Sequence, residues 1–242
     1  MRNNPQPATG LYVLACENGV TSIQLRQSVL QHTAAAAQEI DAAADFIPCV
    51  VDRVCDAIKT KSDRVVVRAE LFGRLSLPAT VDRHFFVHNA KNRNLIRIES
   101  DLDLVIMKKA WLFNGPHLIL AINAFYEREL DFRQYVRDNP ELVEEVLQEY
   151  SIGCLQSWSE RHPLTHDSAV KLNEELRLTA HDTHQRFRQN PDIVERIAHR
   201  FARPTEKQPM GLQEFFSNMA YKVVEPTLAY QRRTGTRLTE LM

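Results

Sequence analysis

The chain has 242 residues, of which 44% are hydrophobic and 25% are charged. These are ordinary globular values, and the length suits one large domain or two small domains with a real core. Thirty Lys and Arg side chains against 31 Asp and Glu give a net charge of −1, so no overall positive field would hold nucleic acid or an anionic membrane. The seven glycines are widely spaced, which excludes a G-x-G-x-x-G dinucleotide turn and a G-x-x-x-x-G-K-[ST] phosphate loop.

Cysteine spacing and apolar runs bear on where the protein works. The four cysteines, Cys16, Cys49, Cys55 and Cys154, form no C-x-x-C pair, and the first residues lack the charged and then apolar pattern of a signal peptide. No apolar run approaches the roughly 20 residues that a membrane span needs. We therefore expect a cytoplasmic protein without a membrane segment.

The first elements are a strand and two helices. Residues 11–16 are apolar and are followed by Asn18-Gly19, which predicts a buried strand closed by a turn. Residues 21–46 are rich in Ala, Gln and Leu, which favours a helix. After Pro48, a second helix is predicted because apolar side chains recur at helical spacing, at Val50, Val51, Val54 and Ile58.

An antiparallel meander is predicted next. Apolar and polar residues alternate over residues 64–77 and 95–107, which is typical of half-buried strands, and residues 84–88 form a shorter candidate strand. Gly73 interrupts the first alternation and should mark a bulge or a close approach of backbone or of a ligand. Asn114-Gly115-Pro116 predicts a hairpin turn between residues 111–113 and 118–126.

Helical periodicity dominates beyond about residue 127. Residues 136–146 resemble residues 187–197, and each copy has Asn, Pro and an acid in order at a helix start: Asn139, Pro140 and Glu141, then Asn190, Pro191 and Asp192. Either a helical hairpin was duplicated, or two helices converged on the same capping chemistry. We predict an α+β protein, with an antiparallel-sheet domain over residues 1–127 and a helical domain over 128–242, or both as one integrated unit.

The two repeat copies carry opposite charges. The first helix is expected to expose four acids, and the second carries basic side chains: Glu141, Glu144, Glu145 and Glu149 against Arg196, His199, Arg200 and Arg203. These are either two solvated faces or complementary faces through which copies of the chain associate. We expect a homo-oligomer.

A phrase with enzyme-like chemistry is Ser100-Asp101-Leu102-Asp103-Leu104-Val105. Two aspartates two residues apart on a strand point to the same side and can share a divalent cation. The phrase resembles the corresponding strand of the DNA-polymerase-β-like nucleotidyltransferases, which implies metal-dependent nucleotidyl transfer with Asp131 as the third carboxylate. The Gly-Ser turn of that superfamily is missing here. The alternative is that these aspartates lie on the solvent-exposed face of an amphipathic strand and pair with Arg68 and Arg74 on a neighbouring strand.

Two histidine pairs have spacings that suit metal ligands on a helix, His162 with His166 and His181 with His184. Pro163 interrupts the first pair, and no H-E-x-x-H motif is present. We expect neither a metal site nor a cofactor.

Local basic clusters remain, with aromatic residues interleaved in the first. Arginine and aromatic side chains on a sheet can stack unpaired bases, and positive grooves can follow a phosphate backbone. We therefore expect a non-catalytic protein that self-associates and binds RNA or single-stranded nucleic acid. The alternatives are the nucleotidyltransferase and an adaptor without nucleic-acid binding. The predicted contacts are Arg74, Arg83, Lys91, Arg93 and Arg97 in the first half, and Arg186, Arg188, Arg196, Arg200, Arg203 and Lys207 in the second.

Overall fold

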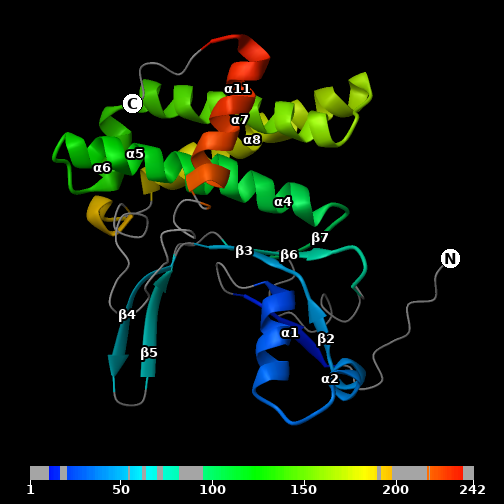
Figure 1. Ribbon diagram of the computed structural model, residues 1–242. Helices are drawn as coiled ribbons and strands as arrows, with labels where there is room; N and C mark the ends of the chain where they lie inside the picture. The colour runs from blue at the N-terminus through cyan, green and yellow to red at the C-terminus, as the bar shows by residue number, and fades with distance from the viewer. Residues whose placement is uncertain are drawn as a thin grey trace. The chain divides into compact units, whose positions relative to one another are not determined.

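The computed structural model describes residues 11–16, 21–53, 55–61, 64–69, 73–81, 95–189, 192–197, 217 and 219–236 (Figure 1). Contacts divide the chain into two compact units, Met1–Ile106 (unit 1) and Met107–Met242 (unit 2). Unit 1 holds the described strands, and unit 2 is helical, so the predicted α+β class is confirmed. The division between the units lies N-terminal to the soft boundary that we expected near residue 127.

Unit 1 begins with a parallel strand pair and two helices. Strand β1 (Tyr12–Leu14) pairs with β2 (Asp45–Ile47), and Leu14 lies opposite Ile47. Helices α1 (Ser22–Gln31) and α2 (Ala37–Ala43) form the connection between them. Thr21 begins α1 with a capping box, because its hydroxyl accepts from the Gln24 N–H and the Gln24 side chain accepts from the Thr21 N–H. The single helix predicted over residues 21–46 is therefore two helices and a strand.

Five more strands lie among the described residues of unit 1. Strands β3 (Val50–Asp52), β6 (Arg74–Pro78) and β7 (Ile96–Glu99) form one sheet, antiparallel between β3 and β6 and parallel between β6 and β7. Strands β4 (Cys55–Lys61) and β5 (Arg64–Ala69) form a separate antiparallel pair. The predicted meander is thus partly confirmed. The helix predicted after Pro48 is wrong, since Val50 and Val51 lie in β3 and Ile58 lies in β4, and β-branched side chains favour strands.

Gly73 lies just before β6, where the predicted alternation breaks. A Cβ atom added at Gly73 would lie 3.1 Å from Nε of Arg53, tighter than most real contacts. The group close to Gly73 is thus a side-chain guanidinium, where the sequence predicted a bulge, backbone or a ligand.

Unit 2 is built around one long helix that replaces two predicted elements. Helix α4 (Leu102–Lys109) starts at the end of unit 1 and continues through the π-helical turn η2 (Ala110–Asn114) into α5 (Gly115–Tyr126). The predicted hairpin at Asn114-Gly115-Pro116 is wrong, because these residues lie inside the helix. The strand predicted over 95–107 ends at Glu99, since the Asp101 carboxylate accepts from the Leu104 N–H and begins α4.

The remaining described helices of unit 2 are α6 (Phe132–Asp138), α7 (Pro140–Arg161), α8 (His166–Gln189), the π turn η3 (Ala220–Val224) and α11 (Glu225–Thr234). Helix α11 crosses α7, as Figure 1 shows in red and green. The predicted helical second half is confirmed. In the residues that the structure describes, no helix is both long and apolar enough to cross a membrane.

The predicted repeat is only partly described. Asn139 and Pro140 begin α7 as expected, but the Asn139 side chain donates to the Tyr135 carbonyl instead of capping α7. Asn190 and Pro191 lie outside the described residues. Asp192 is buried, and its backbone carbonyl accepts from the Phe132 N–H. Glu149, expected on an exposed acidic face, is also buried.

Two glycines allow the helices of unit 2 to pack closely. A Cβ atom added at Gly115 would meet the Lys222 carbonyl oxygen of η3, and one added at Gly153 would meet the Pro226 carbonyl oxygen of α11. Both approaches would be far shorter than real contacts, at 2.3 Å. Gly153 lies in the middle of α7, where the backbone of α11 occupies the space that a side chain would need.

Candidate functional site

The long helix of unit 2 widens at the π turn η2, where the Gly115 N–H donates to the Ala110 carbonyl. Pro116 follows directly and has no N–H to donate to the carbonyl four residues earlier. A π turn bonds each carbonyl to the N–H five residues on, and such turns are frequent at functional sites. The turn η3 is built in the same way, with Pro226 after it, and the Trp111 and Tyr221 rings of the two turns lie 6.0 Å apart.

His117 lies in the first turn of α5 and is buried. Three phenylalanine rings surround its imidazole, with centroid distances of 5.6 Å to Phe113, 4.6 Å to Phe132 and 5.2 Å to Phe187. The guanidinium carbon of Arg186 lies 4.1 Å from the centroid of the Phe113 ring. The imidazole is thus held by aromatic contacts on several sides.

A buried carboxylate faces this imidazole. Oδ2 of Asp192 lies 3.6 Å from Nε2 of His117, and the Asp192 side chain is 1% exposed. The other oxygen, Oδ1, accepts from Nε of Arg196 at 2.7 Å and from the Ile193 N–H at 2.9 Å. These bonds fix the carboxylate, because charged hydrogen bonds are among the strongest in proteins. Asp192 is therefore held in place beside the His117 imidazole.

Two further polar residues flank the π turn. Lys109 precedes the turn and Asn114 ends it, and both are half-buried. Residues five apart lie nearly above one another in a π turn, and His117 follows Asn114 at the spacing of three that shares a helix face. An ammonium, an amide and an imidazole thus share one side of this helix. Sequence analysis missed these residues because the false hairpin prediction placed Asn114 in a turn, which removed the helical spacing that relates it to Lys109 and His117.

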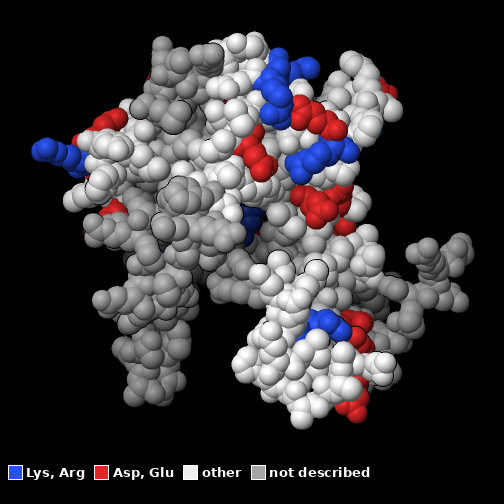
Figure 2. Space-filling view, in the orientation of Figure 1, with Lys and Arg blue, Asp and Glu red and all other residues white. Residues whose placement is uncertain are grey.

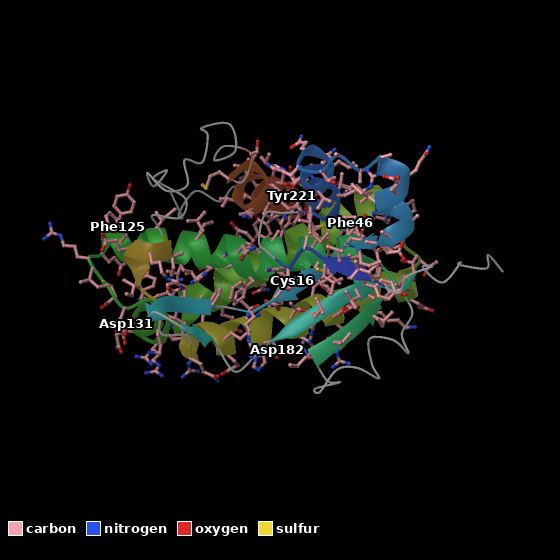
Figure 3. All side chains as sticks on the ribbon, turned by 90° about the horizontal axis from the view of Figure 1, so that it is seen from below. Cys16, Phe46, Phe125, Asp131, Asp182 and Tyr221 are labelled. Carbon is pink, nitrogen blue, oxygen red and sulfur yellow. The ribbon has the colours of Figure 1, made fainter. Side chains whose placement is uncertain are left out.

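The three carboxylates of the nucleotidyltransferase alternative do not form the predicted arrangement. Asp101 caps α4 and Asp103 is exposed in the first turn of that helix, so the two do not share a strand. Asp131, labelled in Figure 3, caps α6 by accepting from the Arg133 and Gln134 N–H groups. Among the described residues, no group of three or more His, Cys, Asp or Glu side chains could hold a metal ion.

The predicted nucleic-acid contacts separate into three groups. Arg74 and Arg97 are exposed on the neighbouring strands β6 and β7, and Arg188 is exposed on α8. Arg186 and Arg196 make the contacts with Phe113 and Asp192 described above. On the face drawn in Figure 2, the basic and acidic side chains of the described residues are interspersed. The other predicted contacts lie outside the described residues: Arg83, Lys91, Arg93, Arg200, Arg203 and Lys207.

Neither histidine pair forms a ligand set. Helix α7 ends before Pro163, and the His162 ring stacks on Trp158 with centroids 4.0 Å apart. His166 begins α8 on the other side of the connection. Burial, followed by the charge of Arg188, lowers the pKa of His184.

Comparison with known proteins gives little. No family model and no curated protein matches the sequence. One solved structure that resembles the chain is mannitol 2-dehydrogenase of Pseudomonas fluorescens, in a ternary complex with NAD and D-mannitol. The identity is 18% and the TM-score is 0.47, and the match covers 78% of this chain. It spans 39% of the length of that enzyme.

Proposed function

We propose that the π turn of unit 2 is a small-molecule site in which His117 moves a proton to or from a hydroxyl or carbonyl group of the ligand. The observation that carries the proposal is the buried His117–Asp192 pair, which lies three residues beyond Asn114 and eight beyond Lys109 along the same helix. An imidazole is the side chain best suited to proton transfer near neutral pH. A fixed carboxylate beside it favours one ring orientation and the charged form.

Lys109 and Asn114 would hold the oxygen of the ligand. A lysine ammonium donates charged hydrogen bonds, and an asparagine amide both donates and accepts. Together they suit a hydroxyl that becomes an alkoxide or a carbonyl oxygen that gains negative charge. The substrate class that fits these groups is therefore a small, neutral or anionic molecule with an alcohol or carbonyl group.

Lys109→Met tests this proposal, with Lys108→Met as the matched control. The Lys108 ammonium pairs with Glu175 on α8. Removing that ammonium changes the local charge by the same amount but leaves Lys109, Asn114 and His117 in place. Thermal shift with a panel of polyols, 2-hydroxy acids and their carbonyl counterparts would first identify a binder. We expect Lys109→Met to weaken that binder about tenfold or more, as loss of one charged hydrogen bond does. Equal affinity in the two variants would contradict the proposal.

Nucleic-acid binding is a second candidate, favoured by one observation on the three-stranded sheet. Ser76 pairs with Arg97, and Arg74 lies two residues before Ser76, so both arginines share one face. Asp52 lies opposite Arg74, and the Ser76 hydroxyl donates to Glu99, so this face also carries carboxylates. Nucleic-acid binding is the second candidate because this face of the sheet carries both positive and negative side chains.

Filter binding of a single-stranded RNA at low salt would test the second candidate. Arg74→Gln combined with Arg97→Gln is expected to lower both retention and its salt dependence, whereas Arg177→Gln on α8 is the control. No retention by the unaltered protein, or equal retention by all variants, would contradict it.

A cytoplasmic location and self-association are further proposals that rest on the sequence alone. An adaptor role without nucleic-acid binding predicts association in the absence of any ligand. Light scattering over a range of protein concentrations measures this directly, and a constant monomer mass would contradict self-association.

A further inference from the structure

Two cysteines follow the paired strands β1 and β2 at matching positions. Cys16 lies two residues after Leu14, and Cys49 lies two residues after Ile47, the partner of Leu14 in the parallel register. Both cysteines therefore follow the same end of the strand pair. Neighbouring strands lie about 4.8 Å apart, and a disulfide needs Cα atoms about 4.4 to 6.8 Å apart. The fold thus brings two cysteines that are distant in sequence to the same end of one strand pair.

A direct contact supports this placement. The Cys49 thiol donates to the Ala15 carbonyl oxygen, with Sγ 3.4 Å from that oxygen. The peptide group that accepts this bond joins Ala15 to Cys16, so the sulfur of Cys49 is one peptide unit from Cys16. The chain turns here, because the Cys16 N–H donates to the Leu14 carbonyl at 3.0 Å. Both cysteines are thiols in this structure.

The two thiols differ in exposure. Cys16 is exposed where the chain leaves β1 (Figure 3), and Cys49 is half-buried. An accessible thiol beside a second one is the usual arrangement of redox-sensitive cysteines, in which the first reacts with the oxidant and the second resolves the product. Cys154 differs from both, since it is buried in unit 2 and its burial raises the pKa of its thiol to about 12.

We propose that Cys16 and Cys49 are a peroxide-sensitive modification site that closes to an intramolecular disulfide. The Cys16 thiolate attacks one oxygen of hydrogen peroxide, the O–O bond breaks, and Cys16 becomes a sulfenic acid while the other oxygen leaves as water. The Cys49 thiolate then attacks the sulfenic sulfur, the S–S bond forms, and the S–O bond breaks to release a second water. Two thiols lose two electrons in all, and the peroxide gains them.

The disulfide would join the end of β1 to the residue just before β3. It would close a loop that contains α1, α2 and β2, and closing such a loop removes conformational freedom from the unfolded chain. We expect the midpoint of thermal unfolding to rise by about 5 °C on oxidation and to return on reduction. This inference does not depend on the proposed function of unit 2.

The experiment treats the full chain with hydrogen peroxide, blocks remaining thiols with N-ethylmaleimide and maps the peptides by mass spectrometry. The expected product is a single chain that has lost two hydrogens, with a Cys16–Cys49 linked peptide and with Cys154 alkylated after unfolding. Cys55→Ser should form the same link, whereas Cys49→Ser should leave Cys16 as a sulfenic acid that dimedone traps. Linkage through Cys55 or between chains would overturn the proposal, as would overoxidation of Cys16 with Cys49 unchanged.

Discussion

At the scale of single residues, Gly153 shows how a side chain that is missing can decide the packing of a helix. Glycine inside a helix normally costs stability relative to alanine. Here the α11 backbone occupies the place of a Cβ atom, and the Pro226 carbonyl oxygen would lie 2.3 Å from it. Helix propensity and packing therefore predict opposite signs for the same substitution.

We expect Gly153→Ala to destabilise the protein by about 2 kcal/mol, since overpacking outweighs the gain in helix propensity. Chemical denaturation followed by circular dichroism measures this free energy of unfolding. Gln148→Ala, at an exposed position on the same helix, is the control and should change it little. A stabilised Gly153→Ala variant would show that α11 does not pack on α7 this closely.

Glu149 is a second residue whose environment differs from the prediction, because it is buried and not exposed. Burial, followed by the charge of Glu145, raises the pKa of Glu149 to about 7 from its usual 4.5. The folded protein then binds this proton more tightly than the unfolded chain does. The contribution of Glu149 to stability therefore falls as pH rises from about 4.5 to about 7 and stays constant above that.

Glu149→Gln removes this titration. We expect the variant to match the unaltered protein in unfolding free energy near pH 4 and to be more stable at pH 8. Denaturation curves at several pH values test this, with Glu141→Gln at an exposed site of α7 as the control. A difference that is the same at every pH would contradict the raised pKa.

At the scale of elements, the segment 192–197 is joined to the start of α6 by backbone bonds, and within the segment Arg196 pairs with the buried carboxylate of Asp192. Asp192 and Ile193 meet the chain before α6 through backbone bonds, Phe132 N–H to Asp192 and Val194 N–H to Leu130. The Asp192 side chain is 1% exposed, and that of Arg196 is 28% exposed. Removal of the cation would leave a buried carboxylate without its strongest partner.

Arg196→Met should therefore destabilise unit 2 by about 3 kcal/mol, as loss of one partner of a buried pair does. Arg177→Met breaks an exposed pair with Glu174 and should cost less than about 0.5 kcal/mol. Asp192→Asn combined with Arg196→Met should recover part of the loss, and denaturation of all three variants measures it. Equal small effects for Arg196→Met and Arg177→Met would contradict this role.

Element types were predictable where one periodicity ran without interruption, as in α7 and α8. Element types were not predictable where the same residues suit two different structures. Asn114-Gly115-Pro116 is typical turn chemistry, yet the buried residues on both sides and the π turn keep it helical. Asp101 continues a strand pattern by residue type, yet its carboxylate serves better as a helix cap.

At the scale of the whole molecule, the sequence predicted the α+β class and the helical second half. It did not predict the candidate site, because Lys109, Asn114 and His117 come together only through the π turn, and Asp192 reaches His117 from a segment 75 residues later in the chain. Tertiary proximity of this kind leaves no spacing signal. The sequence signal at His117 was a histidine within an apolar segment. By itself, that pattern predicts a position in the core more often than a functional site.

The central claim is that His117, held by Asp192, meets the ligand of unit 2. Long-range ¹H–¹⁵N NMR of the histidine rings, recorded as a binder from the panel is added, tests it most directly. We predict that the His117 ring resonances move on binding while those of His162 and His166 stay in place, and that Asp192→Asn alters the His117 nitrogen shifts before any ligand is added. Binding that leaves the His117 resonances unmoved would contradict the account.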